Sequence, residues 1–243
     1  MFVVLLKDKI RKLFTFFGLD LTQNLKYDRL THLIIKKTMA NGGVGIDVGC
    51  HKGEILDEII KYSPKEKHYG FEPIPYLYDK LVKKYGFKNH ILPFALSDDT
   101  GETTFHHVKN APAYSGLEQR KYDIPNPDIH QITVEVRRLD DIVDSDCRVT
   151  LIKIDVEGGE MDVLKGAKQT IIRSRPVILF EFGIGASDVY GTSPQEVFEF
   201  FTSLNYKICL LHDYLNQKHG LSLALLEKAY NNDGEFYYVA EAQ

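Results

Sequence analysis

The sequence predicts an α/β protein built on a doubly wound, mostly parallel sheet of seven strands, with one antiparallel strand near the C-terminus. Apolar runs of strand length alternate with segments of helical period along most of the chain. Repeated units of this kind require parallel strands with right-handed crossovers. The run Val44–Gly53, VGIDVGCHKG, is the most specific signal, because it reads as a strand, a glycine-bearing turn and the start of a helix.

The elements of the first half follow from apolar runs bounded by turn residues. In chain order they are a strand at 44–48, a helix at 54–62, a strand at 68–71, a helix at 74–85, a strand at 91–96 and an inserted strand at 102–108. The proline at position 75 is compatible with the second helix, because it falls in the first turn.

The second half continues the same alternation. Its expected elements are strands at 132–136, 150–154, 176–182, 206–211 and 236–240, and helices at 158–174 and 194–204. The strand at 150–154 is continuously apolar except for Lys153. The last two strands are joined by a segment in which we identify little helix, so we expect a hairpin that supplies the antiparallel strand.

Length and composition predict a single domain. With 243 residues, of which 44% are hydrophobic, the chain can bury one sizeable core. We assign residues 41–243 to this domain and residues 1–40 to an N-terminal helical extension. A strand and lid region is inserted at about 99–137. Within it, residues 109–131 carry three prolines and two tyrosines without a clear period, which predicts a lid or an acceptor platform.

Charge and cysteine usage narrow the class of protein. The net charge of −4 and the lack of a basic stripe argue against a nucleic-acid partner. Three cysteines lie far apart without a C-x-x-C pair, which predicts neither disulfides nor zinc and fits a reducing cytoplasm. No apolar run is long enough to span a membrane. Residues 2–19 mix phenylalanines with basic residues; we favour packing on the protein itself, with weak peripheral membrane contact as the alternative.

The turn after the first strand indicates the kind of cofactor. A dinucleotide fingerprint, G-x-G-x-x-G, would need glycine at Asp47 and glycine or alanine at Lys52. The observed pattern is D-x-G-x-x-x-G, and an acid is unfavourable beside a pyrophosphate but favourable beside a cation. S-adenosylmethionine carries a sulfonium and an ammonium group and no phosphate, so we favour it over a nicotinamide dinucleotide.

The cofactor-binding residues are expected at the carboxyl ends of the strands, where ligands of such sheets lie. Gly49 allows close backbone approach, and Gly53 does the same where the helix begins. Glu72 lies about 20 residues beyond Gly53, the spacing of a ribose-binding acid. Either Ser97 or Asp98 is placed to accept a hydrogen bond from an adenine amino group. The predicted cofactor-binding set is Asp47, Gly49, His51, Gly53, Glu72, Ser97 and Asp98.

The candidate catalytic residues are Asp155, Glu157 and His106. Asp155 follows a buried strand at the same edge, where a carboxylate can act as a base. Glu157 lies near the first turn of the next helix, so a helix-dipole role is its simpler explanation. His106 lies on the inserted strand, and a histidine side chain can serve as a general base. Asp155, Glu157 and Glu181 could together hold a divalent metal. Their spacing is not diagnostic of a metal site, so we do not favour a bound metal.

These runs together resemble the FkbM-type methyltransferases. The resemblance extends over residues 44–182, and its motifs are IDVG with Gly53, GFEP at 70–73, ALSD at 95–98, RLDD at 138–141, IKIDVEGGE at 152–160 and LKGA at 164–167. It implies a Rossmann-like class I methyltransferase fold, S-adenosylmethionine as methyl donor, and transfer to a hydroxyl of a sugar, a glycan or a secondary metabolite. The family commonly has Ala-Asn where this chain has Cys50-His51. A non-catalytic scaffold or regulatory domain that binds S-adenosylmethionine is the alternative.

Overall fold

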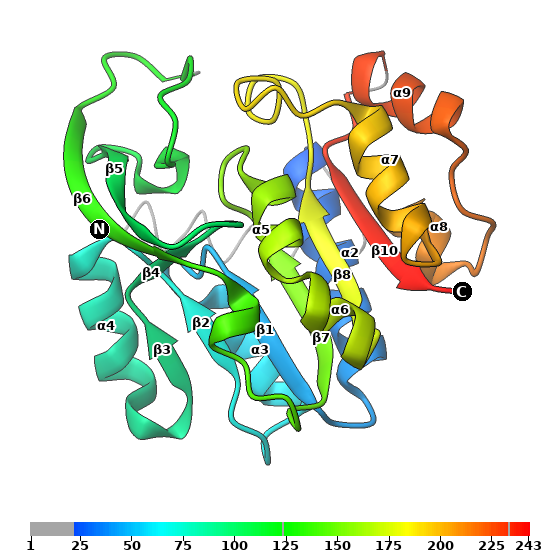
Figure 1. The fold of residues 1–243 in the computed structure, drawn as a ribbon, viewed down its shortest axis with the longest axis horizontal. Helices are drawn as coiled ribbons and strands as arrows, with labels where there is room; N and C mark the ends of the chain where they lie inside the picture. Colours follow the sequence, from blue (N-terminus) through cyan, green and yellow to red (C-terminus); the bar gives the residue numbers. More distant parts are fainter. Residues whose placement is uncertain (1–21, 123, 233) are drawn as a thin grey trace.

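The computed structural model describes residues 22–122, 124–232 and 234–243 (Figure 1). Its centre is a seven-stranded sheet with the order β3-β2-β1-β7-β8-β10-β9. The strands are β1 (Val44–Val48), β2 (Tyr69–Phe71), β3 (His90–Leu92), β7 (Val149–Ile154), β8 (Val177–Glu181), β9 (Tyr206–Leu210) and β10 (Tyr237–Ala242). Only β10 runs antiparallel to its neighbours, which are β8 and β9. The predicted fold class is confirmed.

Helices cover both faces of this sheet (Figure 1). Their bounds are α2 (Gln23–Met39), α3 (Glu54–Tyr62), α4 (Pro75–Tyr85), α5 (Glu160–Gly166), α6 (Lys168–Ser174), α7 (Pro194–Ser203), α8 (Leu211–Leu215) and α9 (Leu223–Asn231). Alternate residues of β7 enter opposite cores, because side chains of a strand alternate between faces. Ile152 and Ile154 pack with α5, α6, α7 and α9, whereas Leu151 packs with α2, α3 and α8.

The strand predicted at 91–96 is two strands in two different sheets. β3 is an edge of the main sheet, and β4 (Phe94–Leu96) belongs to a three-stranded sheet with β6 (Ile129–Arg137) and β5 (Gly101–Val108). Pro93 separates them, because a proline has no amide hydrogen with which to continue a ladder. The small sheet places the inserted region over one end of the main sheet (Figure 1).

The single helix predicted at 158–174 is divided at Ala167 into α5 and α6. Gly166 lies against the backbone of Ser97, in a space that would not admit a side chain. The first amides of α6 are capped by the Asp140 carboxylate, which accepts hydrogen bonds from Gln169 N and Thr170 N, both at 2.8 Å. The amide groups at the start of α6 therefore have the Asp140 carboxylate as their hydrogen-bond acceptor. This stabilises the start of a second helix.

The connection between β9 and β10 contradicts the expectation of a helix-poor hairpin. It contains α8 and α9, and Ser222 caps α9 by accepting a hydrogen bond from Leu225 N. β10 nevertheless lies between β8 and β9 and is antiparallel to both, as expected of the antiparallel strand.

The described part of the predicted N-terminal extension is α2. Thr22 accepts a hydrogen bond from Leu25 N at its start, and apolar residues on one face of the helix are buried against α3, α8 and β7. Residues 2–19, for which membrane contact was the alternative, lie outside the described residues. Among the helices that the structure describes, none has the length and apolar character needed to cross a bilayer.

Candidate active site

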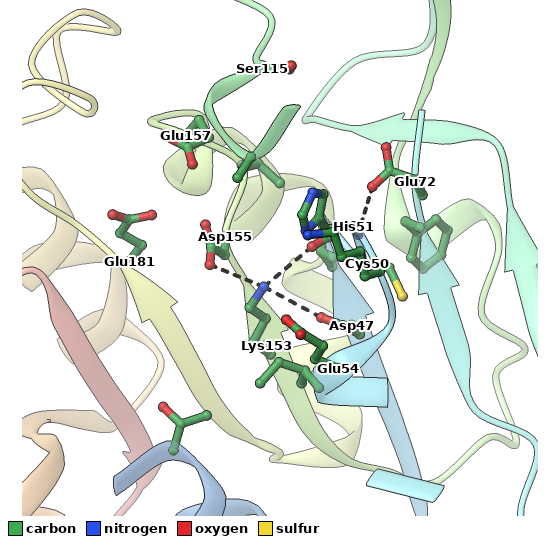
Figure 2. A pocket seen from close by; sticks show the side chains of 18 of the residues that line it. Asp47, Cys50, His51, Glu54, Glu72, Ser115, Lys153, Asp155, Glu157 and Glu181 are labelled. Carbon is green, nitrogen blue, oxygen red and sulfur yellow. Dashed lines mark hydrogen bonds and ion pairs between the residues drawn. The ribbon is translucent and has the colours of Figure 1, made fainter. Parts of the chain in front are cut away.

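A cavity of about 1470 Å³ opens at the carboxyl ends of β1, β2, β7 and β8 (Figure 2). Its polar lining includes Asp47, His51, Glu72, Lys153, Asp155, Glu157 and Glu181. Ligand cavities for small molecules typically span about 300–1,000 Å³, so this one can hold a nucleoside-sized ligand together with a second molecule.

Gly49 brings the end of β1 against the end of β7. Its φ is +76°, a left-handed conformation that favours glycine. A Cβ at this position would overlap the carbonyl oxygen of Asp155. Gly49 therefore allows the close approach of two chain segments, and it also lines the cavity as predicted.

Glu72 fixes the turn that follows β1. Its carboxylate accepts hydrogen bonds from the backbone nitrogens of His51, at 2.7 Å, and Ile74, at 2.9 Å. Burial of this side chain raises its pKa to about 7, although both hydrogen bonds oppose the rise. His51 has a positive φ of 48°, and burial followed by the nearby Lys52 charge lowers its pKa. The predicted ribose-binding acid thus also shapes the cofactor turn.

Lys153 connects two carboxylates at the base of the cavity (Figure 2). Its Nζ lies 3.6 Å from Asp47 Oδ1 and 3.2 Å from Asp155 Oδ2, and it donates a hydrogen bond to Gly49 O at 3.4 Å. Neither carboxylate oxygen of Asp47 has a hydrogen-bond partner within the described chain, although the residue is only 1% exposed. Burial raises the pKa of Asp47, and the Lys153 charge opposes this.

Asp155 is held as a carboxylate by its neighbours. Tyr237, on β10, donates a hydrogen bond to Asp155 Oδ2. Burial raises the pKa of Asp155, but the Lys153 charge and the hydrogen bonds from Glu181 and Tyr237 outweigh it, so the pKa lies below the usual value. The pKa of Glu181 is shifted the opposite way, well above its usual value, first by burial and then by the Asp155 charge. The two carboxyl groups are therefore shifted in opposite directions, Asp155 toward its charged form and Glu181 toward its neutral form.

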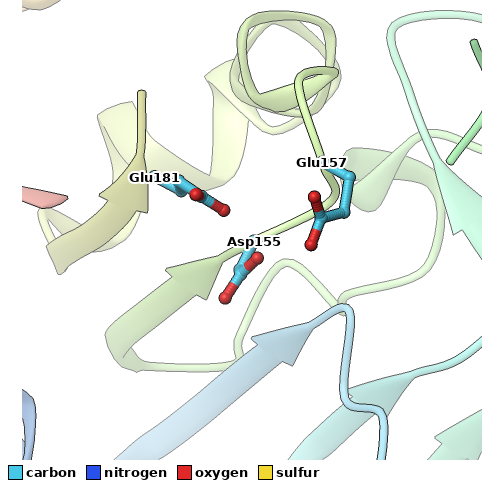
Figure 3. Close-up of side chains that lie close together, drawn as sticks. All are labelled: Asp155, Glu157 and Glu181. Carbon is cyan, nitrogen blue, oxygen red and sulfur yellow. The ribbon is translucent and has the colours of Figure 1, made fainter. Parts of the chain in front are cut away.

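The three carboxylates of Asp155, Glu157 and Glu181 face one another (Figure 3). One oxygen from each lies within 4.8 Å of the others. Glu157 forms an ion pair with Arg120, which comes from the predicted lid region, and Lys153 pairs with Asp155. Two cationic side chains thus already balance the charge of this acidic group.

Glu160 has a structural role. Its Oε1 accepts hydrogen bonds from Val156 N, at 2.9 Å, and Gly158 N, at 3.1 Å, and so closes the turn before α5. Burial raises its pKa to about 7.

The predicted lid region is held by contacts with Tyr190 and among its own aromatic residues. Glu118 N donates a hydrogen bond to Tyr190 Oη at 3.0 Å, and the guanidinium of Arg120 lies over the rings of Tyr114 and Tyr122, 5.3 and 5.7 Å from their centroids. Contacts of this kind between a cation and aromatic rings are favourable. Residues of this segment therefore form part of the cavity lining, and a lid role for the segment stays a prediction.

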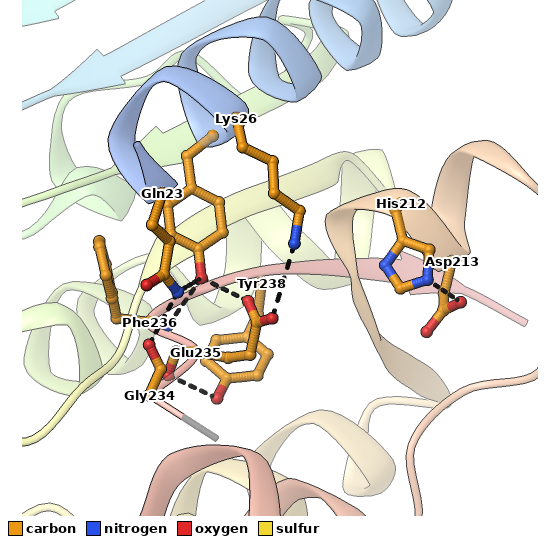
Figure 4. Close-up of polar contacts among 9 residues, drawn as sticks. Gln23, Lys26, His212, Asp213, Gly234, Glu235, Phe236 and Tyr238 are labelled. Carbon is orange, nitrogen blue, oxygen red and sulfur yellow. Dashed lines mark hydrogen bonds and ion pairs between the residues drawn. The ribbon is translucent and has the colours of Figure 1, made fainter. Parts of the chain in front are cut away.

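Residues of α2 also line the cavity. Figure 4 shows Gln23 and Lys26 of this helix in contact with Gly234 and Glu235. Tyr27 lines the cavity and donates a hydrogen bond to Glu235, next to β10. Gln23 Nε2 donates to Tyr27 Oη at 2.8 Å and to Gly234 O at 2.9 Å. This network fixes the N-terminal helix beside Tyr237.

Four predicted site residues lie outside the cavity lining. Gly53 has a φ of +77° and packs under the Tyr85 hydroxyl, so it serves the start of α3. Ser97 and Asp98 lie in an open turn, and Leu96 lines the cavity in their place. His106 pairs through its backbone with Gly116, and its neighbour on the same strand, Phe105, lines the cavity instead, because strand side chains alternate.

Lys153, Tyr237 and Arg120 were not among the predicted site residues. The only available signal for Lys153 was its position as the single charge in an apolar strand. No sequence pattern connects Tyr237 or Arg120 with the carboxylates that they contact, because these contacts join segments far apart in the chain.

Known proteins resemble this chain in sequence and in fold. Residues 47–208 match the family model described as the Methyltransferase FkbM domain. The chain is 28% identical over 173 residues to the 2-O-methyltransferase NoeI of Sinorhizobium fredii (strain NBRC 101917 / NGR234), covering 63% of this chain and 68% of that protein. The crystal structure of Methyltransferase FkbM from Methylobacillus flagellatus KT is 18% identical, with a TM-score of 0.51 over 82% of this chain and 44% of that one. This chain therefore spans less than half the length of that protein. Because the family model matches more than half of its residues, the chain belongs to the FkbM methyltransferase family.

Proposed function

We propose that the protein is an S-adenosylmethionine-dependent O-methyltransferase that acts on a hydroxyl of a sugar, a glycan or a secondary metabolite. The observation that carries this proposal is the buried carboxylate of Asp47, which lines the cavity and is 1% exposed. Among the described residues, Lys153 is the cation paired with it, at 3.6 Å, and Lys153 is shared with Asp155. One ammonium group faces two carboxylates, so a cationic ligand adds to their stabilisation. The relative NoeI is a 2-O-methyltransferase, which supports transfer to oxygen.

The residues of the cavity fit S-adenosylmethionine. Asp47 offers the negative charge that a sulfonium or ammonium group requires, Gly49 offers backbone without a side chain, and Glu72 offers carboxylate oxygens at the end of β2 for ribose hydroxyls. When bound, S-adenosylmethionine supplies a methyl group attached to a sulfonium. The thioether that is released on transfer does not need a proton.

Asp155 is the residue that we propose as general base. It lies at the carboxyl end of β7, half-buried in the cavity, and Lys153 and Tyr237 hold it in its charged form. A hydroxyl acceptor must lose its proton during transfer, and a carboxylate within hydrogen-bond reach can accept it. Glu157 is paired with Arg120, so it is better suited to hold the lid than to move a proton. Alignment of the acceptor under this lid can lower the barrier by about 7–11 kcal/mol.

We further propose that transfer does not need a divalent metal. The ammonium of Lys153 and the guanidinium of Arg120 occupy positions beside Asp155 and Glu157, and these charges perform the balancing that a metal would otherwise perform. Dialysis against a chelator is expected to leave activity unchanged. A loss of activity that Mg²⁺ or Mn²⁺ restores would contradict this.

The proposed function is tested by following transfer of a labelled methyl group from S-adenosylmethionine to a panel of hydroxylated sugars, glycans and polyketide-like alcohols. Wild-type protein is expected to label at least one acceptor, and Asp155→Asn is expected to lose most of this turnover while it still binds the cofactor. Asp162→Asn, a carboxylate change on α5 outside the cavity, is the matched control. Cofactor binding without turnover on any acceptor would instead favour a non-catalytic scaffold.

A further inference from the structure

A second, smaller cleft of about 500 Å³ lies beside the cofactor turn. It is bounded by α4 on one side and by the lid segment at Asn110–Ala113 on the other. Four residues line both this cleft and the main cavity, and they are His51, Lys52, Pro112 and Ala113. A molecule that occupies the main cavity can therefore extend into the smaller cleft past the 3-10 turn at Pro112–Tyr114.

The charge of this cleft is opposite to that of the main cavity. Lys52, Lys80 and Lys84 line it, together with His51, whose pKa is lowered by burial. No aspartate or glutamate lines it, although the chain as a whole has a net charge of −4. The main cavity, in contrast, carries most of the acidic residues described above. An enclosed surface of a single sign concentrates ligands of the opposite sign.

Two of the lysines are available to a ligand. Lys84 is already engaged, because its Nζ lies 2.6 Å from Asp57 Oδ2. Lys52 and Lys80 are both exposed, and neither forms an ion pair with any residue of the described ranges. Both lysines line a cleft whose lining contains no carboxylate that would compete with an anionic ligand.

An aromatic ring completes the surface. Tyr76 is 40% exposed, Lys80 Nζ lies 5.0 Å from the centroid of its ring, and the ring of His107 lies 5.8 Å from it. A partly exposed tyrosine ring beside a lysine suits a sugar ring that bears an anionic substituent, because the sugar packs against the tyrosine while its charge meets the ammonium groups.

We infer that this cleft binds an oxyanion on the methyl acceptor, so that the acceptor is an anionic sugar or glycan carrying a phosphate or a carboxylate. The inference rests on the proposed function, because it assigns the acceptor of that same reaction. It adds a chemical class, an anionic acceptor, and two binding residues, Lys52 and Lys80, neither of which belongs to the catalytic group.

The test measures binding of defined probes to the full chain saturated with S-adenosylmethionine, by calorimetry. The probes are glucose 1-phosphate, glucuronate and uncharged glucose. We expect the anionic probes to bind and glucose to bind far more weakly. The double variant K52A/K80A is expected to weaken anion binding about tenfold, an effect that shrinks as salt is raised. A preference for glucose 1-phosphate would identify a phosphate acceptor, and a preference for glucuronate would identify a carboxylate acceptor.

The matched control is K83A/K88A. It removes the same number of charges from α4 and the turn after it, at exposed positions outside the cleft. Equal loss of anion binding in both double variants would overturn the inference, because it would mean that only overall charge matters. A loss of S-adenosylmethionine affinity in K52A/K80A would also overturn it, by assigning the lysines to the carboxylate of the cofactor. Failure of the wild type to bind S-adenosylmethionine at all would instead reject the proposed function.

Discussion

The ammonium of Lys153 lies 3.6 Å from the carboxylate of Asp47, and both side chains are almost fully buried, 7% and 1% exposed. The same ammonium lies 3.2 Å from Asp155. One buried cation thus holds two acids that come from neighbouring strands, β1 and β7. The acid that we propose for cofactor binding, Asp47, and the acid that we propose as general base, Asp155, therefore share a single charge network.

Lys153→Met is expected to destabilise the fold strongly. It leaves two buried carboxylates without their cation, and loss of one partner from a buried ion pair costs about 3–5 kcal/mol. Urea unfolding measures the effect. Lys207→Met is the control, because Lys207 pairs with Glu241 on a partly exposed strand and its loss should cost less than about 1 kcal/mol. Equal effects of the two substitutions would contradict the account.

Gly49→Ala is expected to lower stability and cofactor affinity together. The methyl group would meet the Asp155 carbonyl in addition to the cost of a left-handed φ. Gly191→Ala carries a similar φ, +73°, but its Cβ has open space. We expect Gly49→Ala to cost about 1–3 kcal/mol more than Gly191→Ala in thermal or urea unfolding. The two variants should unfold alike only if the contact between β1 and β7 is absent.

The sequence predicted most of the strands that carry this site but few of the contacts between its side chains. Asp47 and Glu72 could be placed in the cavity because Asp47 lies near the end of β1 and Glu72 follows β2, and the carboxyl ends of parallel strands meet at one edge. The periodicity at 91–96 gave no sign that β3 and β4 enter different sheets. Only Pro93 carried that information, and a proline in an apolar run is also compatible with an edge strand.

The remaining contacts depend on tertiary packing. Tyr237 reaches Asp155 across the sheet from the last strand, and Arg120 reaches Glu157 from an irregular segment. Neither pairing has a local sequence signature. His106 was predicted from its residue type. A side chain on a strand reaches the cavity only if it lies on the face of the strand that meets the cavity, and His106 lies on the other face.

The stability of the protein is expected to fall as pH rises from about 4.5 to 7, partly because of Glu160. Burial raises the pKa of Glu160 to about 7 in the folded state, whereas an unfolded glutamate titrates near 4.3. The folded state thus binds the proton more tightly, so its contribution is complete below the unfolded pKa and is lost as pH rises through the folded one. At about 1.4 kcal/mol for each pKa unit, the loss amounts to about 4 kcal/mol.

Glu160→Gln isolates this contribution. The amide oxygen of glutamine can still accept from both Val156 N and Gly158 N, which bond to a single oxygen of the glutamate. Urea unfolding between pH 4 and pH 8 should show a flatter dependence in this variant than in wild type. Glu102→Gln, on the exposed start of β5, should keep the wild-type slope, and an unchanged slope in Glu160→Gln would count against the buried-carboxyl explanation.

Tyr237→Phe is expected to raise the pKa of Asp155. The hydroxyl of Tyr237 donates a hydrogen bond to the carboxylate and so favours its charged form. Loss of the bond should move the acidic limb of the kcat/KM profile to higher pH, because the base must be deprotonated. Carbon-13 NMR of the carboxyl groups gives the same pKa without an acceptor. Tyr206→Phe, whose hydroxyl donates to Pro176 O, should change stability but leave the profile in place.

The central claim is that the cavity binds S-adenosylmethionine through Asp47 and Glu72. Titration calorimetry of wild type, Asp47→Asn, Glu72→Ala and the exposed control Asp99→Asn tests it most directly, with circular dichroism as the check on folding. We predict binding to wild type and Asp99→Asn, at least about tenfold weaker binding to Asp47→Asn, and none to Glu72→Ala. Undiminished affinity in folded Asp47→Asn and Glu72→Ala would contradict the assignment of this cavity to the methyl donor.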